Sequence, residues 1–154
     1  MTQTDPLPHG ADVALRGLEL AHGRLREGVK KYFRGDGGAL VAVALSEALY
    51  WIAVLDYHGL KHVSDYSQKR DSSPGGRTVC GLGYARNFDA HELISTSEAA
   101  LPEIQLRWTT LQNLPAPKRA EKRGRDQMYD EKVAERPLTQ PIADARAWLD
   151  SILR

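Results

Sequence analysis

The sequence predicts an all-α protein built as an antiparallel up-and-down four-helix bundle, with a long polar loop and a small strand-like insertion before the last helix. Apolar side chains recur at helical spacing in four segments, glycine or proline stands near the segment ends, and one segment alternates between polar and apolar residues. The four expected helices span residues 11–34, 39–58, 79–97 and 141–153.

The bulk composition is typical of a soluble globular protein. The chain has 154 residues, 42% of them hydrophobic and 27% charged, which fits a single domain, 1–154. The net charge of +1 favours no class of partner, so any attraction to nucleic acid would have to be local. The single Cys80 excludes an internal disulfide and suits a reducing cytosol. Residues 1–10 are polar, unlike a secretory signal, and are expected to be flexible. A cytoplasmic protein with no membrane contact is therefore predicted.

The first two helices differ in their pattern. Segment 11–34 is amphipathic and stops at the turn Gly35-Asp36-Gly37-Gly38. Segment 39–58 is apolar nearly all round and ends at Gly59, which is typical of a central helix covered on several sides. Its apolar run is interrupted by Ser46 and Glu47, so a buried core helix is favoured over a membrane span.

The middle of the chain changes character twice. Residues 61–77 are rich in Ser, Asp, Lys and Gly, which predicts a mobile loop. Residues 79–97 then follow as a helix that Pro102 ends at the latest. Arg86 falls in the centre of the apolar stripe of this helix, and Asn87 and His91 lie on its flank, one turn apart.

The region before the last helix is expected to be an insertion, 101–126. Residues 103–110 alternate, with Leu106 and Trp108 on one side, and predict a short half-buried strand. A basic run follows it. The last helix, 141–153, has an inner apolar stripe that includes Trp148 and Leu149.

The motif Arg86-Asn87-x-x-x-His91 resembles the R-x4–6-H signature of the HEPN superfamily, in which a polar residue directly follows the arginine. Arg16 and His22 fit the same spacing, but Gly17 follows that arginine. The resemblance implies a helical bundle that dimerises so that two motifs face one another. Many members are metal-independent endoribonucleases of toxin–antitoxin and phage-defence systems, and others are non-catalytic binding modules.

The motif residues suit RNA cleavage without a metal or cofactor. Histidine exchanges protons near neutral pH, so His91 is the expected acid or base. Arg86 can clamp phosphate oxygens with two parallel hydrogen bonds, and Asn87 can orient His91 or a phosphate oxygen. One copy lacks the second acid or base, so a homodimer is expected to supply it. The expected products carry a 2′,3′-cyclic phosphate and a 5′-hydroxyl.

Other residues are assigned supporting roles, each with an alternative. Glu47 either pairs with Arg86, or reaches an edge of the bundle or bonds to a backbone group. Tyr84 either stacks on a base or packs as a core or interface aromatic. Cationic side chains on the loop and in the insertion either contact RNA phosphates or belong to solvated surface segments. These cations are Lys69, Arg70, Arg77, Lys118, Arg119, Lys122 and Arg123.

Three functions therefore stay open on the sequence. The leading hypothesis is a HEPN-type endoribonuclease acting on single-stranded RNA, with an antitoxin or another neutralising protein as a further partner. The first alternative is a non-catalytic helical dimer that binds RNA or protein. The second is a structural dimerisation protein in which Arg86 and His91 are satisfied by nearby carboxylates. No metal site is predicted: His58 and His62 have the spacing of a ligand pair but no accompanying carboxylate pattern.

Overall fold

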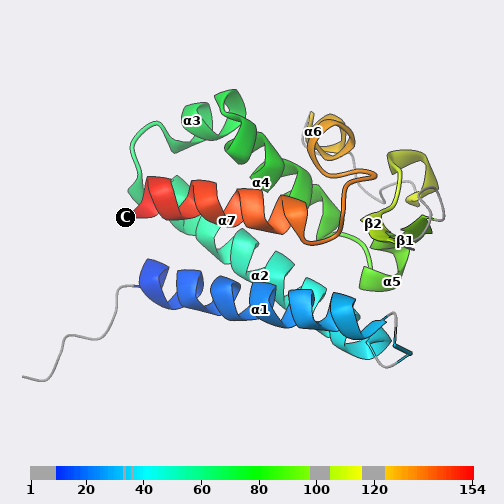
Figure 1. The fold of residues 1–154 in the computed structure, drawn as a ribbon. Helices are drawn as coiled ribbons and strands as arrows, with labels where there is room; N and C mark the ends of the chain where they lie inside the picture. Colours follow the sequence, from blue (N-terminus) through cyan, green and yellow to red (C-terminus); the bar gives the residue numbers. More distant parts are fainter. Residues whose placement is uncertain (1–9, 33, 36, 98–104, 116–123) are drawn as a thin grey trace, which may run out of the picture.

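Two long antiparallel helices form the first half of the protein (Figure 1). The computed structural model describes residues 10–32, 34–35, 37–97, 105–115 and 124–154. Helix α1 spans Gly10–Tyr32 and α2 spans Gly38–His62, which confirms both predicted helices, the second with four further residues at its C-terminal end. The turn between them needs glycine at Gly37, because a Cβ there would lie 2.3 Å from the backbone nitrogen of Tyr32.

Helix α2 is covered on one side and bare on the other. Its inner side is buried against α1, α4 and α7, where Val41, Leu45, Ala48, Ile52 and Leu55 are almost inaccessible. It is the one helix in the described part of the chain that is long and apolar enough to cross a bilayer. Its packing inside this fold is compatible with a soluble protein.

The predicted loop at 61–77 is wrong, because most of it is helical. Helix α3 spans Tyr66–Ser72, and α4 spans Pro74–Ala85. Ser73 caps α4, since the Gly76 N–H donates to the Ser73 hydroxyl oxygen at 3.2 Å, and Pro74 stands in the first turn. The segment looks polar because α3 does not bury an apolar stripe. It buries a tyrosine and an arginine, Tyr66 and Arg70, which both donate hydrogen bonds to Asp56.

The predicted helix 79–97 is also wrong beyond residue 85. Helix α4 ends at Ala85, a turn follows, and a short helix α5 spans Ala90–Leu93. Asp89 starts α5 through a capping box, in which its own N–H donates to the Glu92 carboxylate at 3.2 Å. The next residues form strand β1, Ile94–Ser97. Arg86 therefore lies outside any helical core stripe.

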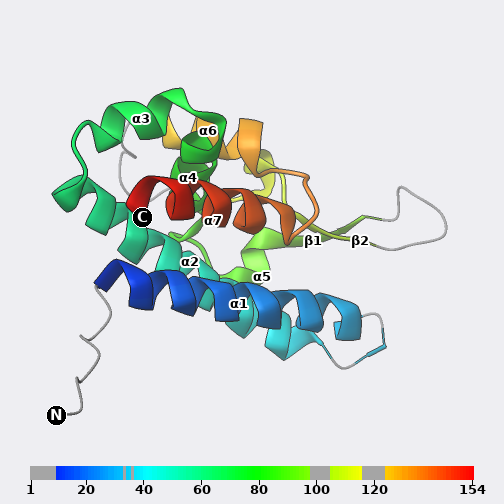
Figure 2. The same cartoon turned by 60° about the vertical axis from the view of Figure 1, so that its left-hand side comes forward.

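The strand predicted at 103–110 is confirmed in its centre as β2, Gln105–Trp108. It pairs antiparallel with β1, with Ile94 opposite Trp108 and Thr96 opposite Leu106, and the hairpin projects beyond the helices (Figure 2). A 3-10 helix, Leu111–Asn113, follows β2. The buried Trp108 indole N–H donates to the Leu138 carbonyl at 3.0 Å, which ties the strand to the chain before the last helix.

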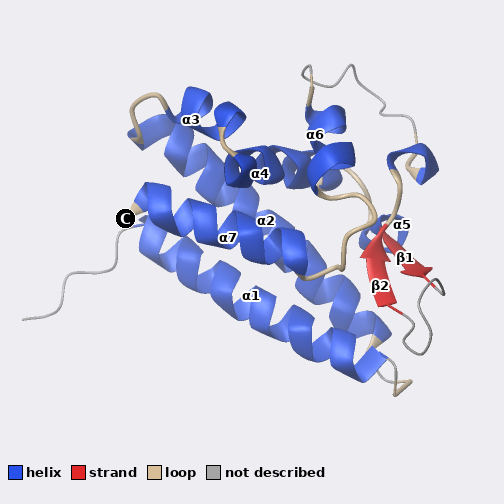
Figure 3. Cartoon of the chain, turned by 45° about the horizontal axis from the view of Figure 1, so that its top comes forward, coloured by secondary structure: helices blue, strands red, loops and turns tan. Residues whose placement is uncertain are grey.

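Two helices complete the fold. Helix α6, Arg125–Lys132, was not predicted; it packs on α4 and buries Tyr129. Helix α7, Gln140–Leu153, confirms the predicted last helix and packs against α1, α2 and α4 (Figure 3). The protein is thus mostly helical, as predicted, with one two-stranded sheet in its described part. The up-and-down four-helix bundle stays a prediction.

Candidate functional site

The three motif residues lie at the corner between α4 and α5. Arg86 directly follows α4, and its backbone N–H donates to the Leu82 carbonyl at 3.1 Å. The Arg86 side chain is exposed, and its guanidinium lies 5.9 Å from the ring centroid of Tyr50 on α2. This distance is typical of a cation–π contact, which holds the cation against α2 while leaving its N–H groups open to solvent.

Asn87 and His91 are exposed beside Arg86 in the sequence. Asn87 belongs to the turn after α4, and its N–H donates to the Tyr84 carbonyl at 3.1 Å. His91 lies in α5, which packs against α2. The corner therefore presents a guanidinium, an amide and an imidazole at the surface, where the sequence had predicted Arg86 within a core stripe.

A pocket of about 390 Å³ lies between α2 and α4 and collects two of the three motif residues. Arg86 and Asn87 line it together with Arg125, the first residue of α6. His91 is not among its lining residues. The rest of the wall comes from α2 and α4, namely Ile52, Ala53, Asp56, Tyr57, Leu60, Val79 and Gly83.

A buried polar network lies behind the α2 wall of this pocket. The Arg70 guanidinium donates to both oxygens of Asp56, at 3.0 and 3.1 Å, and the Tyr66 hydroxyl donates to the same carboxylate at 2.9 Å. Arg70 Nε also donates to Asp71 at 3.1 Å. Burial acts to lower the pKa of Arg70, but the charge of Asp56 outweighs it, so the pKa is raised and the pair stays ionised. Arg70 thus fixes α3 to α2 and is not available to RNA.

The other predicted RNA-binding cations are scattered. Lys69 is exposed on α3, and Arg77 donates to the Glu131 carboxylate of α6 at 2.6 Å. The remaining four lie outside the described residues, namely Lys118, Arg119, Lys122 and Arg123. The structure therefore gathers none of the described ones at the motif corner.

Glu47 and Tyr84 make contacts within the fold. The Glu47 carboxylate pairs with Arg24 of α1, not with Arg86. Tyr84 is buried, and its ring packs against Phe88 and Tyr129 at centroid distances of 5.3 and 5.8 Å. Tyr84 therefore anchors the turn that carries Arg86 and is closed to a nucleic-acid base.

An exposed apolar face on α2 borders the motif corner and was missed from the sequence. We call it the α2 outer face; it consists of Val43, Tyr50, Tyr57 and Leu60, which are 57%, 50%, 60% and 46% exposed. The first three recur every seven residues, so they lie along one line of the helix. Because α2 is apolar nearly all round, its sequence alone did not show which side would remain bare. Arg86 packs at the edge of this face, over Tyr50.

The chemistry available at the corner is that of anion binding and proton transfer. Arginine supplies a permanent charge and histidine a titratable group. In the described part of the chain, no group of three or more His, Cys, Asp and Glu side chains is placed to hold a metal ion. Comparison with protein-family models, curated proteins and solved structures finds no match to this chain.

Proposed function

We propose that this protein is a HEPN-like homodimeric endoribonuclease that cleaves single-stranded RNA without a metal ion. Arg86 and His91 are its catalytic residues, and Asn87 supports them. The observation that carries the proposal is the exposure of all three side chains at one corner, next to an uncovered apolar face. An exposed guanidinium and an exposed imidazole can reach the phosphate of a bound strand.

The α2 outer face is the proposed dimer contact. The four side chains of this face are each 46–60% exposed, and covering them is favourable by about 25 cal/mol per Å² of apolar area. A two-fold axis through this face sets each α2 against its copy. Because Arg86 packs on Tyr50 at the edge of the face, its copy then comes to the same seam.

In the proposed reaction, His91 of one protomer takes the proton from a ribose 2′-hydroxyl, whose oxygen attacks the adjacent phosphorus. The P–O5′ bond breaks, and His91 of the partner subunit gives its proton to the leaving 5′-oxygen. Arg86 stabilises the extra negative charge on the five-coordinate phosphorus. The products are a 2′,3′-cyclic phosphate and a 5′-hydroxyl, so no water is consumed in this step.

The direct test is cleavage of single-stranded RNA by the purified protein in EDTA. We expect the parent protein to cut, and Arg86→Ala and His91→Ala each to lower the rate by at least 100-fold, on the order of the effect of losing one catalytic group. Arg16→Ala, which removes an exposed arginine of α1, is the matched control and should cut normally. Both motif side chains are exposed, so melting curves should shift little. A parent protein that leaves RNA intact would refute the proposal.

A non-catalytic module that binds RNA or protein is the second candidate. It is favoured by one observation: His91 does not line the pocket that holds Arg86 and Asn87. Binding of RNA without cutting, unchanged in His91→Ala, would identify it. The proposed biological role, as a toxin or defence nuclease with a neutralising partner, predicts toxicity on expression in cells that either motif substitution relieves.

A further inference from the structure

We propose that the pocket between α2 and α4 binds a nucleoside phosphate, with its phosphate between Arg86 and Arg125 and its base against the apolar α2 wall. This rests on the proposed function, because Arg86 serves in both. The new elements are Arg125 as a phosphate-binding residue and the pocket as the seat of the base. The ligand is either one unit of an RNA strand or a free nucleotide, since both carry the same chemistry.

Arg125 reaches the pocket across a glycine of α4. A Cβ placed on Gly83 would lie 3.3 Å from the Arg125 Nη1 atom, so the guanidinium lies almost against the bare backbone of that helix. Gly83 precedes Arg86 by three residues, which is close to one helical turn, so the two positions lie near each other at the end of α4. The guanidinium of α6 is thereby brought to the motif corner from a segment distant in sequence.

Both guanidinium groups line the same pocket. In the part of the chain that the structure describes, Arg86 and Arg125 form no ion pair with any carboxylate. Asp56 is the one carboxylate lining the pocket, and Arg70 holds it by two hydrogen bonds. Two like charges at one pocket favour an anion between them, and the planar forks of arginine match phosphate oxygens.

The wall next to these charges is apolar and partly aromatic. Ile52, Ala53 and Val79 contribute aliphatic surface. Tyr57 and Leu60 also line the pocket and belong to the α2 outer face, so the pocket lies where the proposed dimer contact ends. The Lys61 ammonium lies 4.6 Å from the centroid of the Tyr57 ring and adds a third cation nearby. The volume of about 390 Å³ falls in the range that holds small ligands. A base offers a flat apolar face to such a wall, whereas inorganic phosphate would leave it wet.

Binding is measured by calorimetry in EDTA on the His91→Ala protein, so that no strand is cut. The probes are inorganic phosphate, uridine and adenosine 5′-monophosphates, and a short 5′-hydroxyl oligouridine. We expect at least one nucleotide-bearing probe to bind at least tenfold more tightly than inorganic phosphate. Binding of the oligouridine alone assigns the ligand to the strand, and binding of the monophosphates assigns it to free nucleotide as well. If no probe binds, or phosphate binds as tightly as the others, the inference is wrong.

The role of Arg125 is tested by Arg125→Gln in the same background. We expect about tenfold weaker binding of the nucleotide probe and, for oligouridine, a slope of log K against log salt reduced by about 0.7, the value for one lost contact to a single strand. Arg16→Gln makes the same charge change on α1 and should alter neither quantity. An affinity of Arg125→Gln within twofold of its parent overturns the assignment.

The two proposals fail separately. If the parent protein cuts RNA and Arg125→Gln binds the nucleotide probe normally, the nuclease proposal is supported and the pocket proposal is refuted. If the parent protein does not cut RNA, yet binds a nucleotide with an affinity that falls in Arg125→Gln, the nuclease proposal is refuted and the pocket proposal is supported.

Discussion

Replacing Arg70 by methionine should strongly destabilise the protein. Arg70 is 8% exposed, and its side chain and that of Asp56 are 10% and 16% accessible. Removing one partner of such a buried pair leaves an uncompensated carboxylate and typically costs about 3–5 kcal/mol. For a chain of this length each kcal/mol lowers Tm by about 2–4 °C, so Tm should fall by roughly 6–20 °C.

The assay is urea and thermal unfolding followed by circular dichroism. Lys69→Met, on the exposed side of the same helix, is the matched control and should change stability by no more than about 0.5 kcal/mol. Adding Asp56→Asn to Arg70→Met removes the stranded charge but keeps an acceptor for the Tyr66 hydroxyl, so it should recover at least half of the loss. The reasoning is refuted if Arg70→Met lies within about 1 kcal/mol of the parent, or if the double variant is no more stable than the single one.

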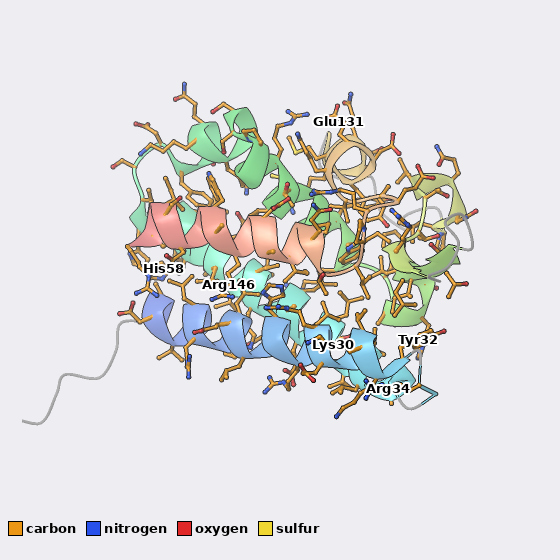
Figure 4. The ribbon with its side chains drawn as sticks, viewed as in Figure 1. Lys30, Tyr32, Arg34, His58, Glu131 and Arg146 are labelled. Atoms are coloured by element: carbon orange, nitrogen blue, oxygen red, sulfur yellow. The ribbon has the colours of Figure 1, made fainter. Side chains whose placement is uncertain are left out.

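Two further predictions concern buried titratable groups. Burial, with Arg146 and Arg26 nearby, lowers the pKa of His22 on α1, and Figure 4 shows Arg146 of α7 directed towards that helix. Near and below the ordinary histidine pKa of 6.5, the unfolded chain therefore binds more protons than the folded protein. The free energy of unfolding should fall as the pH drops from about 7 towards 5, and His22→Gln should weaken this pH dependence. An equally steep pH dependence in His22→Gln would contradict the prediction. Burial raises the pKa of the Cys80 thiol to about 11, so a disulfide reagent at pH 8 should label it only as the protein unfolds, with a rate that rises in urea; immediate labelling of the native protein would contradict this.

Local sequence patterns were sufficient where a helix buries one apolar stripe or is apolar throughout. They located α1, α2 and α7 to within a few residues, apart from the C-terminal extension of α2. They failed at 66–77, because α3 anchors itself through Arg70 and Tyr66, whose acceptor Asp56 belongs to a different helix. By composition alone such a segment resembles a loop, because the hydrogen bonds that stabilise its buried polar side chains reach an acceptor outside the segment.

The motif, too, has some features that the sequence shows and others that depend on the folded structure. The sequence shows its residue types and their spacing, and these alone suggested phosphate chemistry. The residues Asp89 and Glu92, which form a capping box in the structure, have the spacing of a helix start, but the prediction of one helix over 79–97 rested on apolar spacing alone. The strand that follows depends on β2, which meets β1 only through pairing between separate segments of the chain.

Residue order was enough to establish a mostly helical protein and a cationic motif with a histidine, because helix periodicity and side-chain chemistry are properties of near neighbours. Tertiary packing decides which side of α2 stays exposed and which carboxylate pairs with which arginine. The packing of α4 against α6 also brings Arg125 to the pocket that Arg86 lines. Those contacts join residues far apart along the chain, and no local pattern encodes them.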